Sequence, residues 1–469
     1  MCGWPESRNE IVLRKPLSTI AFTITGTVAC SILLSTPVLA QSSSGSSGSQ
    51  TTPWAGGPSE GLVVNLIGDL LGPGISEHVG VMAGDLGIMA SLGTGKEFAI
   101  IFGDSFRGAR FGEGEWMSPV GVVAEFDTDG RIIIKRALNN DEVVQQLLDY
   151  EHNARGLTLL PSDVINIDGT LYMQGMWNEG VGNVLYTQIW RSPDQGVNWE
   201  NVDITPNDYM GGMGNLITWD LSPDGYVYMM SSQFKRSHDV YLTRFRPEDI
   251  GTREAWEHYS LDRNGTGTWG TAYTPVLSQS VRAGEMSLRH IEGHWVLSMF
   301  NAETMAIEVR ISREIARDWN EITPANVVVA GSHGWGGAQD ENNFTQLYGG
   351  YIAPGSTLGN MDLVVSQWNT SNNSRYMSTQ FNVQGLDKFF GITPEDAMRS
   401  RSLTETPQAP AVGNQDVIKV EVTQVDEQVA EQLAPEEMME SLTEITVIPL
   451  DDADPVFLEA ADGPGRFAG

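Results

Sequence analysis

The chain has 469 residues, and its 28 Lys and Arg against 60 Asp and Glu give a formal net charge of −32. Hydrophobic residues make up 41% of the chain, which is enough for a sizeable core and excludes a wholly disordered protein. The negative charge argues against nucleic acid and against anionic lipid as partners, because both attract a basic surface.

The N-terminal region has the pattern of a secretory signal peptide over 1–40. Three basic residues precede an uncharged apolar stretch over 17–39, and small residues stand at its end, at Val38 and Ala40. We expect cleavage after Ala40, and therefore a secreted protein of the cell envelope without a membrane span. An uncleaved membrane anchor is the alternative, since the apolar stretch is long enough to cross a bilayer.

Both cysteines, Cys2 and Cys30, lie inside this predicted signal peptide. The mature chain would therefore contain no disulfide and no thiol chemistry, and its core alone would stabilise the fold. Residues 41–58 are rich in Ser and Gly, which predicts a flexible linker between the signal peptide and the folded body.

Residues 59–385 have the pattern of an all-β domain, in which short apolar runs alternate with turn residues. Strong hairpin signals occur at Asp129-Gly130, Asp168-Gly169, Asp224-Gly225 and Glu292-Gly293. The hairpins recur at intervals of roughly 50–70 residues, which favours a five-bladed β-propeller of the sialidase or arabinanase type. Its units are expected near 80–135, 155–200, 210–260, 280–325 and 345–382. A two-sheet sandwich is the alternative, and short helices are expected only at 141–148, 312–318 and near 393–399.

The segment 192–199 has the sequence S-P-D-Q-G-V-N-W, which matches the S-x-D-x-G-x-x-W pattern called the Asp-box. Such a segment resembles the hairpin turns of sialidase-like propellers. Its Asp and Ser side chains can bond turn amides, its Gly can adopt positive φ, and its Trp can pack under the turn. The motif favours a propeller but says nothing about catalysis, because it lies at the outer rim of a blade.

Residues 386–469 are predicted to be an acidic and mostly disordered tail. From residue 401 onward, fifteen acidic residues stand against three basic ones. We expect only a weak strand at 417–422 and a weak helix at 430–442. The tail is interpreted as a solvated segment, with docking at the cell envelope as the alternative.

The chemistry has to come from carboxyl groups. The sequence contains no HExxH, Walker or GxSxG motif. His290 and His294 are four residues apart in a strand pattern, where that spacing does not make a metal pair. No metal or cofactor is expected, with a structural calcium in the central channel left open. A propeller enzyme of this composition would most simply use paired acids, which suit glycoside cleavage.

Three carboxyl residues stand out, because Asp85, Asp104 and Glu285 each follow a glycine in an apolar setting. A carboxylate loses hydration there and needs a compensating role. That role is either catalytic or structural, as a turn or a buried hydrogen bond. Four tryptophans are candidates for stacking on sugar rings, with core packing as the alternative: Trp116, Trp177, Trp295 and Trp368.

Seven short motifs occur in order across residues 60–385. They are G-D-L-G at 84–87, F-G-D-S-F at 102–106, W-M-S-P at 116–119, R-S-H-D-V-Y-L-T-R at 236–244, G-E-M-S at 284–287, Y-G-G-Y-I-A-P at 348–354 and S-Q-W at 366–368. The set resembles the actinobacterial propeller family known as domain of unknown function 4185. Ala353 stands where a polar residue, often His, is expected in that family, a departure that would alter a subsite.

The resemblance implies a glycoside hydrolase similar to the family 183 endo-D-arabinanases. Those enzymes cut α-linked D-arabinofuranose chains of arabinogalactan and lipoarabinomannan. We therefore expect a secreted, monomeric enzyme of carbohydrate metabolism whose partner is a cell-wall polysaccharide.

The expected mechanism places Asp85 and Asp104 at the propeller axis, one as general acid and the other as general base. Glu285 would be either the true acid or a group that raises the pKa of the acid. By analogy with other five-bladed glycosidases, we expect inversion at the anomeric carbon. The expected substrate-binding residues are Trp116, Ser118, Trp177, Arg236, Tyr351, Gln367 and Trp368.

Two other functional classes stay open. A non-catalytic glycan-binding propeller would keep the tryptophans and could dispense with the acids, and an envelope interaction protein would work through the acidic tail. A sialidase is disfavoured, because sialate recognition calls for an arginine cluster and the arginines here are sparse and scattered.

Overall fold

The computed structural model describes residues 56–93, 95–153, 156–180, 182–393, 418–421 and 446–449. The predicted signal peptide, most of the predicted linker and the predicted tail helix at 430–442 lie outside these residues. Within the described ranges, no helix has both the length and the apolar character needed to span a bilayer.

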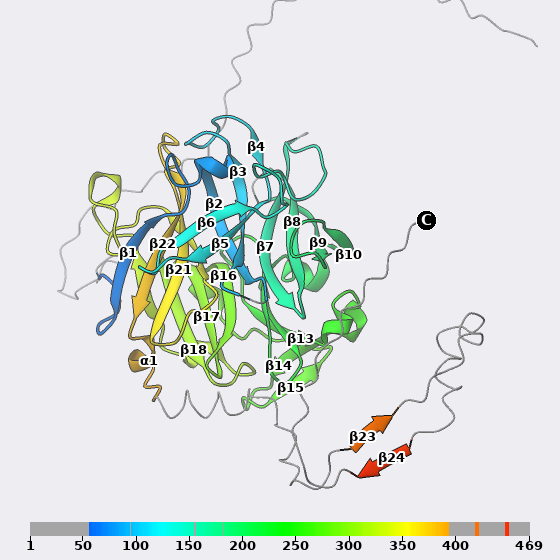
Figure 1. Ribbon diagram of the computed structural model, residues 1–469. Helices are drawn as coiled ribbons and strands as arrows, with labels where there is room; N and C mark the ends of the chain where they lie inside the picture. Colours follow the sequence, from blue (N-terminus) through cyan, green and yellow to red (C-terminus); the bar gives the residue numbers. More distant parts are fainter. Residues whose placement is uncertain are drawn as a thin grey trace, which may run out of the picture. The chain divides into compact units, whose positions relative to one another are not determined.

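The body consists of five antiparallel sheets arranged as the blades of a propeller, as the sequence predicted (Figure 1). The first blade contains β2 (Ala83–Ser91), β3 (Phe98–Phe106), β5 (Val120–Phe126) and β6 (Ile132–Ala137), with β4 (Trp116–Met117) beside β3. The second contains β7 (Leu157–Ile167), β8 (Thr170–Glu179), β9 (Val184–Ser192) and β10 (Glu200–Pro206).

The remaining blades follow in chain order. The third contains β11 (Leu216–Leu221), β12 (Val227–Ser232), β13 (Tyr241–Phe245), β14 (Glu257–Leu261) and β15 (Gly267–Gly270). The fourth contains β16 (Ala283–Ile291), β17 (His294–Asn301), β18 (Ala306–Ser312) and β19 (Ala325–Val329). The fifth contains β20 (Leu347–Ile352), β21 (Asn360–Trp368), β22 (Tyr376–Gln384) and, at its edge, β1 (Val63–Asp69).

Strand β1 closes the ring by pairing antiparallel with β22, from Val63 opposite Gln384 to Asp69 opposite Thr379. Figure 1 shows this closure as the blue strand β1 beside the orange β22. The sequence did not predict it, because no turn signal connects two segments more than 300 residues apart. The closure joins the two ends of the propeller and so holds the first blade against the last.

The five innermost strands, β2, β7, β11, β16 and β20, contact one another around the central axis. Residues near their starts line one cavity and residues near their ends line another, so the strands share one direction along the axis. Innermost and middle strands are buried on both faces, whereas the outer strand β6 alternates between buried and exposed residues. This burial explains the continuous apolar runs in the sequence.

The predicted turns are present. Asp168 and Gly169 have φ values of 50° and 87°, as a two-residue hairpin turn between twisted strands requires. In the Asp-box, which connects β9 and β10, Asp194 Oδ1 accepts hydrogen bonds from Ser192 Oγ at 2.8 Å and from the Asn198 N–H at 2.9 Å. The motif therefore stabilises an outer turn, as expected.

Helical structure is sparse in the described residues. The predicted helices at 141–148 and 312–318 are wrong, because the first segment forms bends with a bridge residue at Gln146 and the second is the end of β18 followed by bends. The helix predicted near 393–399 lies outside the described residues except for its first residue. The helix that forms is α1 (Leu386–Phe389), and short 3-10 turns span 77–79, 209–212, 247–249, 253–255, 279–281, 319–321 and 334–336. In the tail, β23 (Ile418–Glu421), close to the predicted strand, pairs with β24 (Thr446–Pro449).

Candidate active site

Three carboxyl groups gather where the innermost strands begin. Asp85 lies on β2, Asp104 on β3 and Glu285 on β16, and all three line one cavity of about 500 Å³. These are the three residues that the sequence singled out as candidate catalytic groups. They belong to the first and fourth blades, and the ring brings them together from positions up to 200 residues apart in the chain.

The backbone leaves regular pairing at all three carboxyl residues. Asp85 and Asp104 are skipped in the register between β2 and β3, and Glu285 is skipped in the register between β16 and β17. All three lie at register shifts, where bulges turn a side chain away from regular alternation. Leu86 has a φ of 62°, a region that non-glycine residues rarely adopt, and its N–H donates to Ser366 Oγ at 2.8 Å. The backbone next to Asp85 is therefore strained, a feature that often accompanies functional sites.

The glycines before the carboxyl residues are required by close packing. A Cβ at Gly103 would lie 2.7 Å from Asp85 Oδ1, and a Cβ at Gly284 would lie 3.0 Å from the Phe300 ring. Close-packed interiors cannot absorb such contacts without moving the neighbour. The Gly-Asp and Gly-Glu pairs of the sequence are thus explained by the lack of space around the carboxyl groups.

Asp85 is buried, with a relative exposure of 8%. Burial is the main cause that raises the pKa of Asp85 to about 8, and the nearby Asp104 adds to the rise, whereas the hydroxyls of Tyr376 and Tyr348 oppose it. Tyr348 donates to Oδ2 at 2.8 Å, and Oδ1 has no hydrogen-bond partner in the part of the chain that the structure describes. Burial therefore favours the protonated form of Asp85.

Asp104 has a different surrounding. Burial raises its pKa to about 6, and hydrogen bonds from Trp116 and Thr158 oppose the rise. Trp116 Nε1 donates to Asp104 Oδ1 at 3.0 Å, and Thr158 Oγ1 donates to the same oxygen at 3.2 Å. Burial thus favours the protonated form of both carboxyl groups, and it does so more strongly at Asp85. Two neighbouring carboxyl groups whose pKa values are separated in this way form a candidate acid–base pair.

Glu285 is paired with an arginine. Arg236 Nη2 donates to Glu285 Oε1 at 2.6 Å, and Glu285 Oε2 has no partner among the described residues. Arg236 has a φ of 52°, and its guanidinium lies 4.9 Å from the Phe300 ring and 5.5 Å from the Tyr348 ring. The charge of Glu285 contributes to the raised pKa of Asp85. Of the two roles expected for Glu285, the true acid or a group that raises the pKa of the acid, this contribution fits the second.

Aromatic side chains form one wall of the cavity. Phe111 and Trp368 stack with their ring centroids 4.8 Å apart, and Tyr376 meets both rings edge-on. Trp116 lines the same cavity and donates to Asp104. Such rings can stack on the apolar face of a sugar. The structure therefore places Trp116, Trp368 and Arg236 at the cavity, as the sequence predicted.

Two predicted substrate-binding residues lie elsewhere. Ser118 is fully buried, and its Oγ donates to the Leu159 carbonyl at 2.6 Å. Trp177 packs in the core, where its Nε1 donates to Gln188 Oε1 at 2.8 Å. Neither residue lines the cavity, and the hydrogen bonds described here tie both side chains to the protein interior.

Two further predicted substrate-binding residues, Gln367 and Tyr351, also lie outside the lining of the cavity. Gln367 is fully buried. Its Nε2 donates a hydrogen bond to Gln339 Oε1 at 2.7 Å, and its Oε1 accepts one from Arg375 Nε at 2.9 Å. Tyr351 is 2% exposed and belongs to the core. Neither lines the cavity with the carboxyl groups. Sequence reasoning could not separate these residues from Trp116 and Trp368, because one motif contains both kinds.

Four residues at the site were not predicted. Tyr348 and Tyr376 act on Asp85, Thr158 bonds Asp104, and Phe111 completes the aromatic wall. Tyr348 begins the Y-G-G-Y-I-A-P motif at 348–354, so the sequence carries a signal for it. The others lie in segments without a local signal, and only the closure of the ring brings them to the cavity.

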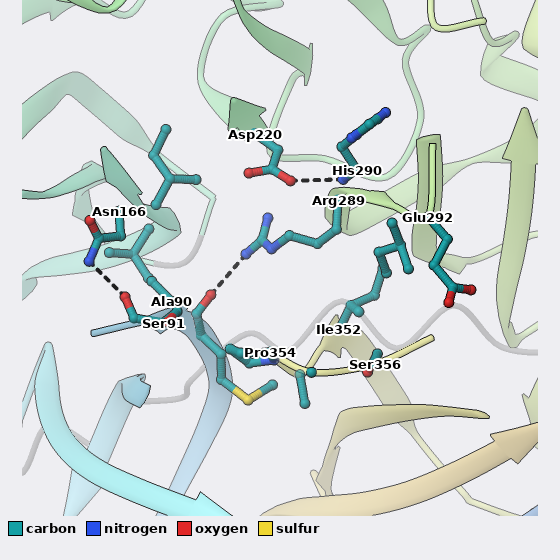
Figure 2. A pocket seen from close by; sticks show the side chains of 16 residues that line it. Ala90, Ser91, Asn166, Asp220, Arg289, His290, Glu292, Ile352, Pro354 and Ser356 are labelled. Carbon is teal, nitrogen blue, oxygen red and sulfur yellow. Dashed lines mark hydrogen bonds between the residues drawn. The ribbon is translucent and has the colours of Figure 1, made fainter. Parts of the chain in front are cut away.

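A second cavity, of about 380 Å³, lies where the innermost strands end (Figure 2). Asp220 accepts a hydrogen bond from the His290 N–H at 2.8 Å, and Asn166 Nδ2 donates to the Ser91 carbonyl at 2.8 Å. Burial raises the pKa of Asp220 to about 6. Ala353 lines this cavity and not the one with the carboxyl groups, so any subsite that it alters lies apart from the acids.

Arg289, whose guanidinium Figure 2 shows at this second cavity, forms an ion pair inside the ring. It donates from Nη2 to Asp163 Oδ1 at 2.8 Å and from Nη1 to Asp163 Oδ2 at 2.9 Å. Asp163 also accepts from the N–H groups of Val164 and Trp219 and from Thr218 Oγ1. This buried acid is fully bonded, which indicates a structural role.

Histidines do not form a metal site here. His290 and His294 lie on the adjacent strands β16 and β17, with His290 opposite Trp295 and His294 opposite Ile291. Among the described residues, no three His, Cys, Asp or Glu side chains gather in a way that could hold a metal ion.

Comparisons with known proteins place the chain in a family. The model of the domain of unknown function DUF4185 matches residues 72–382. An uncharacterized 35.9 kDa protein of Mycolicibacterium smegmatis is 31% identical over 317 residues, which cover 63% of this chain and 92% of that protein.

Solved structures are similar to the chain at low sequence identity. A candidate hydrolase from Bacteroides ovatus is similar with a TM-score of 0.50 and 14% identity, covering 67% of this chain and 88% of that one. A GH43_1 enzyme from Xanthomonas citri has a TM-score of 0.39 and 13% identity, covering 68% and 90%. Since the family model spans nearly the whole propeller, the chain belongs to the DUF4185 family.

Proposed function

We propose that this protein is a secreted glycoside hydrolase that cleaves α-linked D-arabinofuranosyl chains internally, with Asp85 and Asp104 as its acid–base pair. The observation that carries the proposal is that Asp85 and Asp104, two buried carboxyl groups whose pKa values burial raises, line one aromatic-walled cavity. The propeller fold, which the chain shares with a candidate hydrolase, supports it.

The roles follow from the protonation states. Asp85, protonated at neutral pH, donates its proton to the glycosidic oxygen that leaves. Asp104, ionised, accepts a proton from the water that attacks the anomeric carbon. After one turnover Asp85 is ionised and Asp104 is protonated, and exchange with solvent restores both. Arg236 holds Glu285 in place, and the Glu285 charge helps to keep the proton on Asp85.

The substrate class rests on the sequence. The motifs around Asp85, Asp104 and Glu285 resemble those of endo-D-arabinanases, and the predicted signal peptide would deliver the protein to a cell-wall polysaccharide. The cavity shares four lining residues with a neighbouring cavity of about 510 Å³, namely Lys235, Arg236, Phe300 and Met305. A cleft that continues beyond the carboxyl groups suits a chain that extends past the cleaved bond.

Digestion of D-arabinan tests the proposal, with L-arabinan as the matched control polysaccharide. The protein should release oligosaccharides of several lengths from D-arabinan, as internal cleavage requires, and none from L-arabinan. Binding of D-arabinan without release of products would instead support the non-catalytic glycan-binding class. Release from L-arabinan alone would contradict the proposed substrate.

The stereochemical outcome is a separate test. Proton NMR of the first product should show the β anomer, because an inverting enzyme converts an α linkage to a β product. An α product would assign the second carboxylate as a nucleophile and not as a base, and would contradict inversion.

A further inference from the structure

Next to the acids, the cleft has a positive surface in a strongly negative protein. Lys235, Arg236 and Arg282 line the neighbouring cavity of about 510 Å³, with Glu303 as the acidic residue among its lining. We call Lys235, Arg236 and Arg282 the basic groove. Lys235 and Arg236 also line the cavity of the carboxyl groups, so the basic groove is continuous with the candidate active site.

Two of these basic residues have an unusual backbone conformation. Arg236 and Arg282 have φ values of 52° and 54°, in the left-handed region that non-glycine residues seldom adopt. The Arg282 Nε donates to the Arg236 carbonyl at 3.5 Å, and the Ala302 N–H donates to the Arg282 carbonyl at 3.1 Å. Two strained positions are therefore held side by side by their neighbours, a pattern that accompanies ligand-binding segments.

The charges of the basic groove are only partly neutralised. Arg236 forms an ion pair with Glu285. Arg282 Nη1 lies 3.8 Å from Glu303 Oε2, and both of these side chains are at least half exposed. Lys235 forms no ion pair with any residue that the structure describes. Screening limits the effect of distant charges to about 8–10 Å, so the net charge of −32 does not cancel this local cation.

We propose that the basic groove is a subsite for a carboxylate carried by the glycan next to the cleaved linkage. This inference rests on the proposed function and adds a substrate feature to it. One free ammonium and one weakly paired guanidinium suit a single negative charge, and both reach an anion without disturbing the Arg236–Glu285 pair. Without such a subsite, an acidic protein would repel a glycan that carries acidic substituents.

Binding to a catalytically blocked protein tests the subsite. The Asp85→Asn protein would be titrated with two D-arabinan oligosaccharides of equal length, one unmodified and one carrying a succinyl half-ester. We expect the succinylated oligosaccharide to bind about tenfold more tightly, since tenfold corresponds to about 1.4 kcal/mol, the scale of one or two partly exposed charge contacts. The preference should shrink as salt is added.

Matched variants locate the effect. Adding Lys235→Ala and Arg282→Ala should remove the preference, whereas Lys96→Ala with Arg263→Ala, an equal charge change at exposed positions outside both cavities, should keep it. Equal binding of the two oligosaccharides, or a preference that survives loss of Lys235 and Arg282, would overturn the proposal.

A measurement without carbohydrate separates this inference from the proposed function. Sodium succinate, compared with sodium chloride at equal ionic strength, should raise the melting temperature of the wild type more than that of the Lys235→Ala/Arg282→Ala variant. An equal response would reject the carboxylate subsite even if D-arabinan is cleaved. If neither oligosaccharide binds but the succinate response differs, the arabinanase proposal fails and the anion site stands.

Discussion

Asp85 and Asp163 are two buried acids near the propeller axis. They differ in the hydrogen bonds and charges that offset the cost of burying a carboxyl group. Asp163, on β7, is fully buried and accepts five hydrogen bonds, two of them from Arg289. Asp85, on β2, is nearly as buried, accepts from Tyr348, and keeps one oxygen without a partner among the described residues. Burial of an acid alone therefore does not distinguish a structural group from a reactive one.

The difference between these acids lies in the sign of their nearest charges. Asp163 faces a guanidinium, which stabilises the ionised carboxylate. Asp85 faces Asp104 and Glu285, which disfavour ionisation and add to the effect of burial. An uncompensated buried acid costs folding free energy, and proteins keep such groups where function requires them. Substitution of the two acids should therefore change the stability of the protein in opposite directions.

The largest effect is expected at the compensated acid. Asp163→Asn leaves the Arg289 charge buried without its partner, so the free energy of unfolding should fall by about 3–5 kcal/mol. Urea denaturation followed by tryptophan fluorescence would measure it. Glu257→Gln, which breaks the more exposed pair with Arg244, is the control and should cost less than about 1 kcal/mol. A loss at position 163 no larger than in the control would refute the structural role.

Substitution of Asp85 is expected to raise the stability of the protein, whereas substitution of Asp163 lowers it. Its pKa is about 8 in the folded protein against 3.8 ordinarily, so the folded state binds more protons, and stability should fall as the pH rises from about 4 to about 8. Asp85→Asn removes this loss, and its melting temperature should exceed that of the wild type by a margin that grows toward pH 8. A destabilised variant at pH 8 would show that the carboxylate is compensated after all.

Crowding around Asp85 predicts a third effect. In Gly103→Ala the new methyl group would meet Asp85 Oδ1 at 2.7 Å, so the carboxyl group has to move. We expect kcat on D-arabinan to fall by about tenfold or more, because small misplacement of a reacting group is costly. Gly270→Ala, where a Cβ would meet nothing within 4 Å, is the control. Equal kcat in both variants would argue against a reacting role for Asp85.

The smallest expected effect is a shift of the pH profile of activity when the Tyr348 hydroxyl is removed. The pH profile of kcat/KM should be bell-shaped, with limbs near 6 and 8 from Asp104 and Asp85. Tyr348→Phe removes a donor that stabilises ionised Asp85, so the alkaline limb should move upward by about half a pH unit, the scale of one hydrogen bond. Tyr226→Phe, away from the cavity, should leave the profile unchanged. A downward shift at position 348 would contradict the assignment of the alkaline limb to Asp85.

Local patterns in the sequence predicted much of the fold. Asp-Gly turns, apolar runs and the Asp-box depend on neighbouring residues, and they located four blades and most of the fifth. The strand β1 could not be found this way, because its pairing with β22 connects opposite ends of the domain. The helix predicted at 141–148 failed because tertiary packing, and not local periodicity, decides that segment.

The part of the candidate site that depends on local sequence was predicted, and the part that depends on distant segments was not. Glycine before an acid in an apolar strand depends on local crowding, and this signal identified Asp85, Asp104 and Glu285. Whether a motif residue faces the cavity or the core depends on bulges and ring closure, which the sequence does not display. Ser118 and Gln367, expected at the substrate, therefore lie outside the lining of the cavity, and Thr158 and Tyr376 were missed.

Release of oligosaccharides from D-arabinan by Asp85→Asn and Asp104→Asn, each compared with the wild type and with the surface variant Asp129→Asn, tests the account most directly. If the two carboxyl groups carry out the proton transfers, each site variant should retain less than about one hundredth of the wild-type rate, and the surface variant should retain all of it. Wild-type release by either site variant, with its fold intact, would contradict the assignment of this cavity as the catalytic site.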